Sequence, residues 1–376
     1  MMKRLIFLFC IFSVPAFAES EFISQMHTLE KAGDVLGMRI LIKKNYKKKL
    51  SLRDWDDVRK ILKRNYSIGY DAMIAWDRQL SITATILAPE RDQYQKVLEE
   101  ADRMMFEKKF DLAFEKYQSV AQDTKKSSNN KIEKNNFQFY FNVLHQMGRA
   151  LYGMKKFSEA AEVYTWISPS YFLIRQVMFE KMWAAFRAER YDMALGAIAS
   201  QNSAYFSRYL DPESYLVKIY ILKRLCRQQE LKSTLKEIGR YKEELKSNKI
   251  PLKSWAKTDM FRFSIIELID EPTKEATLAL VSSEERLAEK KRIIEQMKAK
   301  YVQEKPGILS QLDKIYGYGL LAVSEGQKML SKISELPSSK EIEKKCSEFW
   351  PADSAEEWFD EVGSHVFIGE SQCIKA

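Results

Sequence analysis

The sequence predicts an all-α protein, and three observations support that class. Glycine and proline are sparse, with 13 and 9 copies in 376 residues, so there is little of the turn punctuation that separates β-strands. Apolar residues recur at intervals of three and four in most windows, which is the spacing of a buried helix face. Similar segments also recur in the middle of the chain, two of them 34 residues apart, which is typical of stacked helical units.

The first residues are typical of a signal peptide. Lys3 and Arg4 precede an uncharged apolar run over residues 5–14, and Ala16-Phe17-Ala18 supplies the small residues that a signal peptidase recognises. The run is about half the length that a membrane span needs, so we expect a cleaved signal over residues 1–18 rather than an anchor. The chain is therefore expected to be exported and periplasmic, with no transmembrane segment.

The composition, 45% hydrophobic and 12% aromatic, is that of a chain able to bury a core. The formal net charge of +9 is a small excess against 52 acidic residues, and a solvated lysine-rich surface accounts for it. Nucleic acid is a poor partner for an exported chain, so no nucleic-acid binding is expected.

Three cysteines follow the signal peptide. Cys346 and Cys373 flank a short C-terminal segment, and an oxidising compartment favours a disulfide between them. Cys226 lies in the apolar stretch IYILKRLC and is expected to be a buried free thiol, because no neighbouring base that would activate it is evident.

Residues 19–90 are expected to form an N-terminal segment of three helices. In the third, Ser51 is suited to be the N-cap, and acidic residues follow in the first turns, where the helix dipole favours them. Pro89 and Asp92 mark the break before the next helix.

Residues 91–250 contain three segments that share one pattern: ADRMMFEKKFDLAFEKY at 101–117, GRALYGMKKFSEAAEVY at 148–164 and MWAAFRAERYDMALGAI at 182–198. Each has a turn, an aromatic residue, an alanine three positions later and a large apolar residue four positions further on. The second and third are 182 − 148 = 34 residues apart. The first and second are 148 − 101 = 47 apart, because the insert DTKKSSNNKIEKNN adds a loop or an extended helix end.

This pattern resembles the tetratricopeptide repeat, a helix–turn–helix unit of 34 residues. The resemblance implies a right-handed α-solenoid. In it, the alanine lies where two antiparallel helices cross, and the aromatic residue fills the wedge between neighbouring units. It also implies that the first helices line a concave face that holds a peptide or a partner protein.

Matching the repeat pattern to this chain places candidate partner-binding residues on that concave face: Arg149, Tyr152, Phe179, Trp183, Phe186 and Arg187. Arginine and tryptophan are residue types that dominate the energetics of interfaces. The alternative, which stays open, is that Phe179 and Trp183 are buried between units.

Residues 251–340 are expected to form a long helical hairpin, with one helix ending near Pro306-Gly307 and a second helix folding back on it. Residues 341–376 are expected to form a disulfide-linked cap. Its aromatic side chains would cover the exposed apolar end of the array.

No set of catalytic residues is evident. The three histidines show no His-Glu-x-x-His spacing, and the sequence has neither a Gly-x-Ser-x-Gly elbow nor a phosphate-binding Gly-x-x-x-x-Gly-Lys loop. A lone helical histidine such as His145 is more often a packed or surface residue than a ligand. We therefore expect no enzymatic activity, no cofactor and no metal.

These features favour a non-catalytic scaffold or adaptor of the bacterial cell envelope that binds a protein or a peptide. Two alternatives stay open. One is a structural subunit of a trans-envelope motility or secretion machine. The other, less favoured, is the helical part of a cell-wall enzyme.

Overall fold

The computed structural model describes residues 20–45, 54, 57, 58, 61, 93–127, 134–171, 173–203, 205–258, 265, 266, 268–331 and 371–373. Within these residues every regular element is a helix, which confirms the all-α class for this part of the chain. The predicted signal peptide and most of the predicted C-terminal cap lie outside it. None of the helices in the described part combines the length and the apolar character that crossing a membrane requires.

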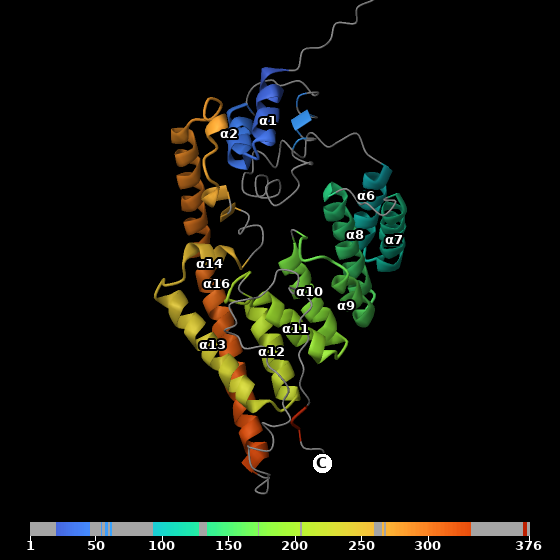
Figure 1. Cartoon of the computed structure of the whole chain (residues 1–376). Helices are drawn as coiled ribbons and strands as arrows, with labels where there is room; N and C mark the ends of the chain where they lie inside the picture. Colours follow the sequence, from blue (N-terminus) through green and yellow to red (C-terminus); the bar gives the residue numbers. More distant parts are fainter. Residues whose placement is uncertain are drawn as a thin grey trace, which may run out of the picture.

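Four helical hairpins follow one another along the chain (Figure 1). The two helices of each hairpin pack together, and the second helix of one packs against the first helix of the next. The bounds are α6 (Gln93–Phe106) and α7 (Phe110–Ser127), α8 (Lys134–Gly153) and α9 (Phe157–Thr165), α10 (Ile174–Arg187) and α11 (Tyr191–Gln201), and α12 (Pro212–Arg224) and α13 (Gln228–Lys246). The lysine-rich insert thus lengthens α7 and begins α8.

The four hairpin turns share one backbone conformation. In the first, the amide of Lys109 donates to the carbonyl oxygen of Met104 at 2.9 Å, and the other three turns have the equivalent bond, which is that of a Schellman cap. The middle residue of each turn has a positive φ: Lys108 (60°), Lys155 (63°), Glu189 (58°) and Cys226 (57°). One local geometry therefore sets how each pair of helices folds back.

The aromatic residues of the repeated pattern lie where the second helices begin. Phe110, Phe157 and Tyr191 are the first residues of α7, α9 and α11, and the alanine three positions after each is fully buried. Phe110 contacts the end of α8, since a Cβ at Gly153 would lie 2.5 Å from its ring. Phe157 likewise contacts the end of α10, because the guanidinium carbon of Arg187, the last residue of that helix, lies 5.0 Å from the centroid of the Phe157 ring. Each of these two rings joins its hairpin to the next.

The helical hairpin predicted for residues 251–340 is wrong. Helix α16 (Ser283–Ser331) is continuous and contains Pro306. Proline removes the amide that would pair with the carbonyl of Val302, but both residues are exposed, so water can hydrate that carbonyl. The buried stripe also continues in phase across the proline, from Tyr301 to Leu312, which is 312 − 301 = 11 residues or about three turns.

The N-terminal helices α1 (Glu21–Lys31) and α2 (Val35–Asn45) confirm the first two helices predicted there. Of the third, residues 54, 57, 58 and 61 are described, and they are helical. Helix α16 packs against α2 and, further along, against α12, α13 and the short α14 (Leu252–Ala256). It therefore connects the N-terminal helices to the fourth hairpin (Figure 1).

Two carboxylates cap the start of α2. Asp34 accepts a hydrogen bond from the Gly37 amide at 2.7 Å, and Glu271 accepts from the amides of Val35 and Leu36 at 3.2 and 3.0 Å. Glycine is needed at position 37, because a Cβ there would lie 2.6 Å from the Asp34 carboxylate oxygens. Three amides that the helix itself leaves unpaired are thus satisfied.

Two buried ion-pair clusters fasten α2 to α16. Arg286 donates to both oxygens of Asp34, at 2.8 and 2.7 Å. Glu289 is paired at 2.8 Å with each of three cations: Arg39, Lys43 and Arg292. Burial raises the pKa of both carboxyl groups, but the hydrogen bonds from their partners outweigh it. The pKa of Asp34 is lowered, and that of Glu289 is lowered to about 2.

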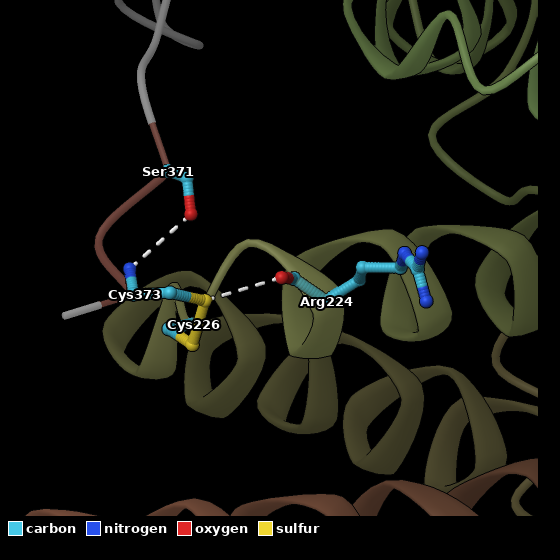
Figure 2. The surroundings of a disulfide bond; sticks show 4 residues. All are labelled: Arg224, Cys226, Ser371 and Cys373. Atoms are coloured by element: carbon cyan, nitrogen blue, oxygen red, sulfur yellow. Dashed lines mark hydrogen bonds between the residues drawn. A yellow bond between two sulfur atoms is a disulfide. The ribbon is translucent and has the colours of Figure 1, made fainter. Parts of the chain in front are cut away.

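The disulfide joins Cys226 to Cys373, so the predicted Cys346–Cys373 pair is wrong and Cys226 is not a free thiol (Figure 2). Cys226 is the middle residue of the α12–α13 turn. Residues 371–373 lie against that turn, where the Gln372 amide donates to the carbonyl oxygen of Leu225 at 2.9 Å. Cys346 and Cys373 flank a short segment, which favoured that pair, but the fold brings together two cysteines 147 residues apart. Cys346 lies outside the described residues.

Peptide mapping without reductant should recover Cys226 joined to Cys373. Closing a loop of 147 residues stabilises by about 5 kcal/mol in the chain-entropy model, so Cys226→Ser should lower the free energy of unfolding by several kcal/mol in a denaturant titration. Cys346→Ser is the matched control and should leave the link and the stability unchanged. Recovery of a Cys346–Cys373 peptide would contradict the structure.

Replacing Asp34 by asparagine should weaken the attachment of α1 and α2 to α16. The variant leaves the Arg286 guanidinium buried without its counter-charge, which costs about 3–5 kcal/mol. Hydrogen exchange should rise across residues 21–45 while the hairpins stay protected. Asp192→Asn changes an exposed acid in the first turn of α11 and is the matched control. Equal exchange in both variants would show that the Asp34–Arg286 pair does not fasten these helices.

Candidate functional site

A groove of about 580 Å³ opens on the first helices of three successive hairpins. Its walls come from four helices, with Arg149 and Tyr152 on α8, Tyr164 on α9, Phe179, Glu180 and Trp183 on α10, and Glu213 on α12. Four of the six candidate residues, Arg149, Tyr152, Phe179 and Trp183, therefore share one surface. That these four residues bind a partner stays a prediction.

Helix periodicity explains why these side chains converge. Phe179 and Trp183 are four positions apart on α10, and Arg149 and Tyr152 are three apart on α8, so each pair lies on one helix face. Helix α9 packs against both α8 and α10 and holds them as neighbours. Phe179 and Trp183 are half-buried. They pack on the core and also line the groove, so the alternative of complete burial between units does not hold.

The carboxylate of Glu180 is the centre of the polar contacts at the groove. Arg149 donates from Nε at 3.0 Å to Oε2 and from Nη2 at 2.6 Å to Oε1. The hydroxyl of Tyr164 donates at 3.0 Å. His145 Nε2 lies 3.0 Å from the same carboxylate, which can only accept, so this ring nitrogen carries a proton. One side chain of α10 thus binds three side chains from the preceding hairpin.

This arrangement sets the protonation of two of its members. Burial raises the pKa of a carboxyl group, but the hydrogen bonds and charges of His145 and Arg149 outweigh burial and lower the pKa of Glu180 to about 2. Burial and the neighbouring carboxylate raise the pKa of Tyr164 far above its usual range. At neutral pH, Glu180 is therefore ionised and Tyr164 is protonated, which is the state in which both bonds form.

His145 continues the network into the core. It is fully buried, and its Nδ1 lies 3.4 Å from the hydroxyl of Tyr171. That hydroxyl donates to Oδ1 of Asn142 at 3.2 Å. Both ring nitrogens of His145 thus have partners within the protein, which agrees with the expectation that this histidine is a packed residue.

The structure does not place Phe186 and Arg187 among the residues that line the groove. The Phe186 ring packs edge-on against Trp183 at 5.8 Å and against Tyr220 at 5.2 Å, so it supports the groove tryptophan from the side. Arg187 is the last residue of α10, and its guanidinium stacks on Phe157 of the preceding hairpin. It therefore serves the contact between hairpins.

Sequence reasoning missed Glu180, Tyr164 and Glu213. Glu180 is an acid within the apolar run IRQVMFEKMWAAF, and its main partners precede it by 31 and 35 residues, close to one repeat length. An acid and two basic side chains spaced by about one repeat could have indicated an ion pair between neighbouring hairpins. Tyr164 occupies the large apolar position of the repeated pattern, which predicted a packing role for it. Glu213 follows the proline that begins α12, where an acidic residue is ordinarily explained by the helix dipole.

The groove offers surfaces for binding. Glu180 accepts from His145, Arg149 and Tyr164 and is ionised at neutral pH, so it has no proton to donate. The groove also presents the half-buried side chains of Tyr152, Phe179 and Trp183 and the exposed carboxylate of Glu213. In the described part of the chain, no group of three His, Cys, Asp or Glu side chains could hold a metal ion.

Replacing Glu180 by glutamine should lower the free energy of unfolding at pH 7 by about 3 kcal/mol, as expected for a pKa lowered from 4.5 to about 2. A lowered pKa stabilises the fold above pH 4.5, and this stabilisation is lost as the pH falls from 4.5 towards 2. The variant should therefore show a flatter pH dependence across that window, measured by urea titration. The exposed Glu115→Gln is the control. Equal curves for the variant and the natural protein would show that Glu180 is not held by these bonds.

No match to this chain is found among protein-family models, curated proteins or solved structures.

Proposed function

We propose that this protein is a non-catalytic scaffold of the bacterial cell envelope, related in design to tetratricopeptide-repeat proteins, that binds a protein or peptide partner. The proposal includes a right-handed α-solenoid built from the four hairpins. The observation that carries it is the groove, in which Tyr152, Phe179 and Trp183 stand half-buried around one shared hollow.

The groove has properties that favour binding. Large rigid aromatic side chains supply contact area at a low cost in conformational entropy, and such residues dominate measured interface energies. The Glu180 network fixes α8, α9 and α10 in one register, so little ordering is left to occur when a partner binds. A hollow of about 580 Å³ has the size of an ordinary ligand pocket.

The proposed periplasmic location rests on the composition of residues 1–18. The Cys226–Cys373 disulfide supports it, because structural disulfides persist in oxidising compartments and are rare in the cytosol.

Site-specific photo-cross-linking in cells tests the function. A photoreactive phenylalanine derivative at Tyr152 should trap a partner protein, and Trp183→Ala should reduce that adduct severalfold by removing the largest ring from the groove. The control is the same residue placed at Trp166, which is 61% exposed and lies outside the groove, together with Trp166→Ala. An adduct that survives Trp183→Ala with the fold intact, or that forms equally from position 166, would refute the groove as the partner site.

A further inference from the structure

The charges at the groove do not cancel. Three charged side chains line it: Arg149, Glu180 and Glu213. Arg149 and Glu180 pair with each other through a two-pronged contact, which neutralises both. In the described part of the chain, Glu213 has one polar contact: its carboxylate accepts from the indole nitrogen of Trp183 at 3.2 Å, and the side chain is exposed. The groove therefore keeps one negative charge without a cation.

The aromatic rings add to this preference. The face of an aromatic ring carries partial negative charge and attracts cations, with tryptophan the strongest of the three types. The hydrogen bond from Trp183 to Glu213 places that carboxylate beside the indole. That bond lies at the edge of the ring, so a cationic head that meets the carboxylate from above the ring plane would also lie near the face of the indole. The aliphatic stem behind such a head suits the apolar surface of Tyr152 and Phe179.

We infer that this groove binds a lysine or arginine side chain of a peptide segment in the partner, with the charged head at Glu213 and the stem against the aromatic rings. The inference rests on the proposed function and names the chemistry that the groove selects.

An acidic side chain fits the groove less well. The guanidinium of Arg149 gives Nε and Nη2 to Glu180, and the contact of Nη1 with Gln146 is long, at 3.4 Å. An incoming carboxylate would have to share this guanidinium with Glu180, and it would meet the like charge of Glu213. The net charge of +9 on the whole chain opposes a basic peptide at long range, but physiological salt screens charges beyond about 8 Å.

Fluorine NMR on the full chain labelled with 5-fluorotryptophan tests the inference. The resonance of Trp183, among seven tryptophans, is identified by its loss in Trp183→Phe. Three capped alanine–serine peptides, identical except for a central lysine, norleucine or glutamate, are titrated in turn. The lysine peptide should shift this resonance and bind about tenfold more tightly than the norleucine peptide, with the difference shrinking as salt rises.

Glu213→Gln should abolish the preference for lysine over norleucine, because the amide keeps the acceptor for Trp183 and removes only the charge. Glu159→Gln changes an exposed acid in the first turn of α9, outside the groove, and should keep the preference. Equal binding of lysine and norleucine, or tighter binding of glutamate, would overturn the inference and leave the proposed function standing. No shift of Trp183 with any peptide would also overturn it, and the adduct from position 152 decides the proposed function independently.

Discussion

The carboxylate of Glu180 holds the second and third hairpins in one register. Burying a charge is unfavourable unless it is paired and hydrogen-bonded, and its partners all stand on α8 and α9. A shift of α10 by one turn would leave both Glu180 and Arg149 without a counter-charge. The positions of Phe179 and Trp183, on either side of Glu180 along the helix, follow from this constraint. The pairing of Glu180 thus also places Phe179 and Trp183 at the groove.

Two kinds of contact organise the rest of the molecule. Along the hairpins, contacts are local in sequence: each turn repeats one cap, and Phe110 and Phe157 each pack on the end of the next first helix. The second kind is long-range, since the clusters around Asp34 and Glu289 join residues about 250 positions apart. Helix α16 connects the two kinds, because it packs on α2 and on the fourth hairpin.

Local patterns in the sequence predicted the hairpins well. The aromatic residue and alanine of each unit placed the starts of α7, α9 and α11 correctly, because the packing of two helices needs those residues at those positions. The repeat pattern placed six residues on one face, and four of them, Arg149, Tyr152, Phe179 and Trp183, line the groove. Prediction failed where distant contacts decide: the apolar stripe of α16 overrides Pro306, the partners of Glu180 come from another hairpin, and Cys373 meets a turn that only the tertiary fold brings near.

The Cys226–Cys373 link also determines how the molecule carries mechanical load. Tension along the chain passes through the disulfide directly from Cys226, in the α12–α13 turn, to Cys373. The 147-residue loop that holds α13 and α16 is outside this line of force. The first three hairpins lie within it, and so does the groove. The disulfide thus removes α13 and α16 from the covalent path of tension, and α16 meets that path through its ion pairs with Asp34 and Arg39 at α2.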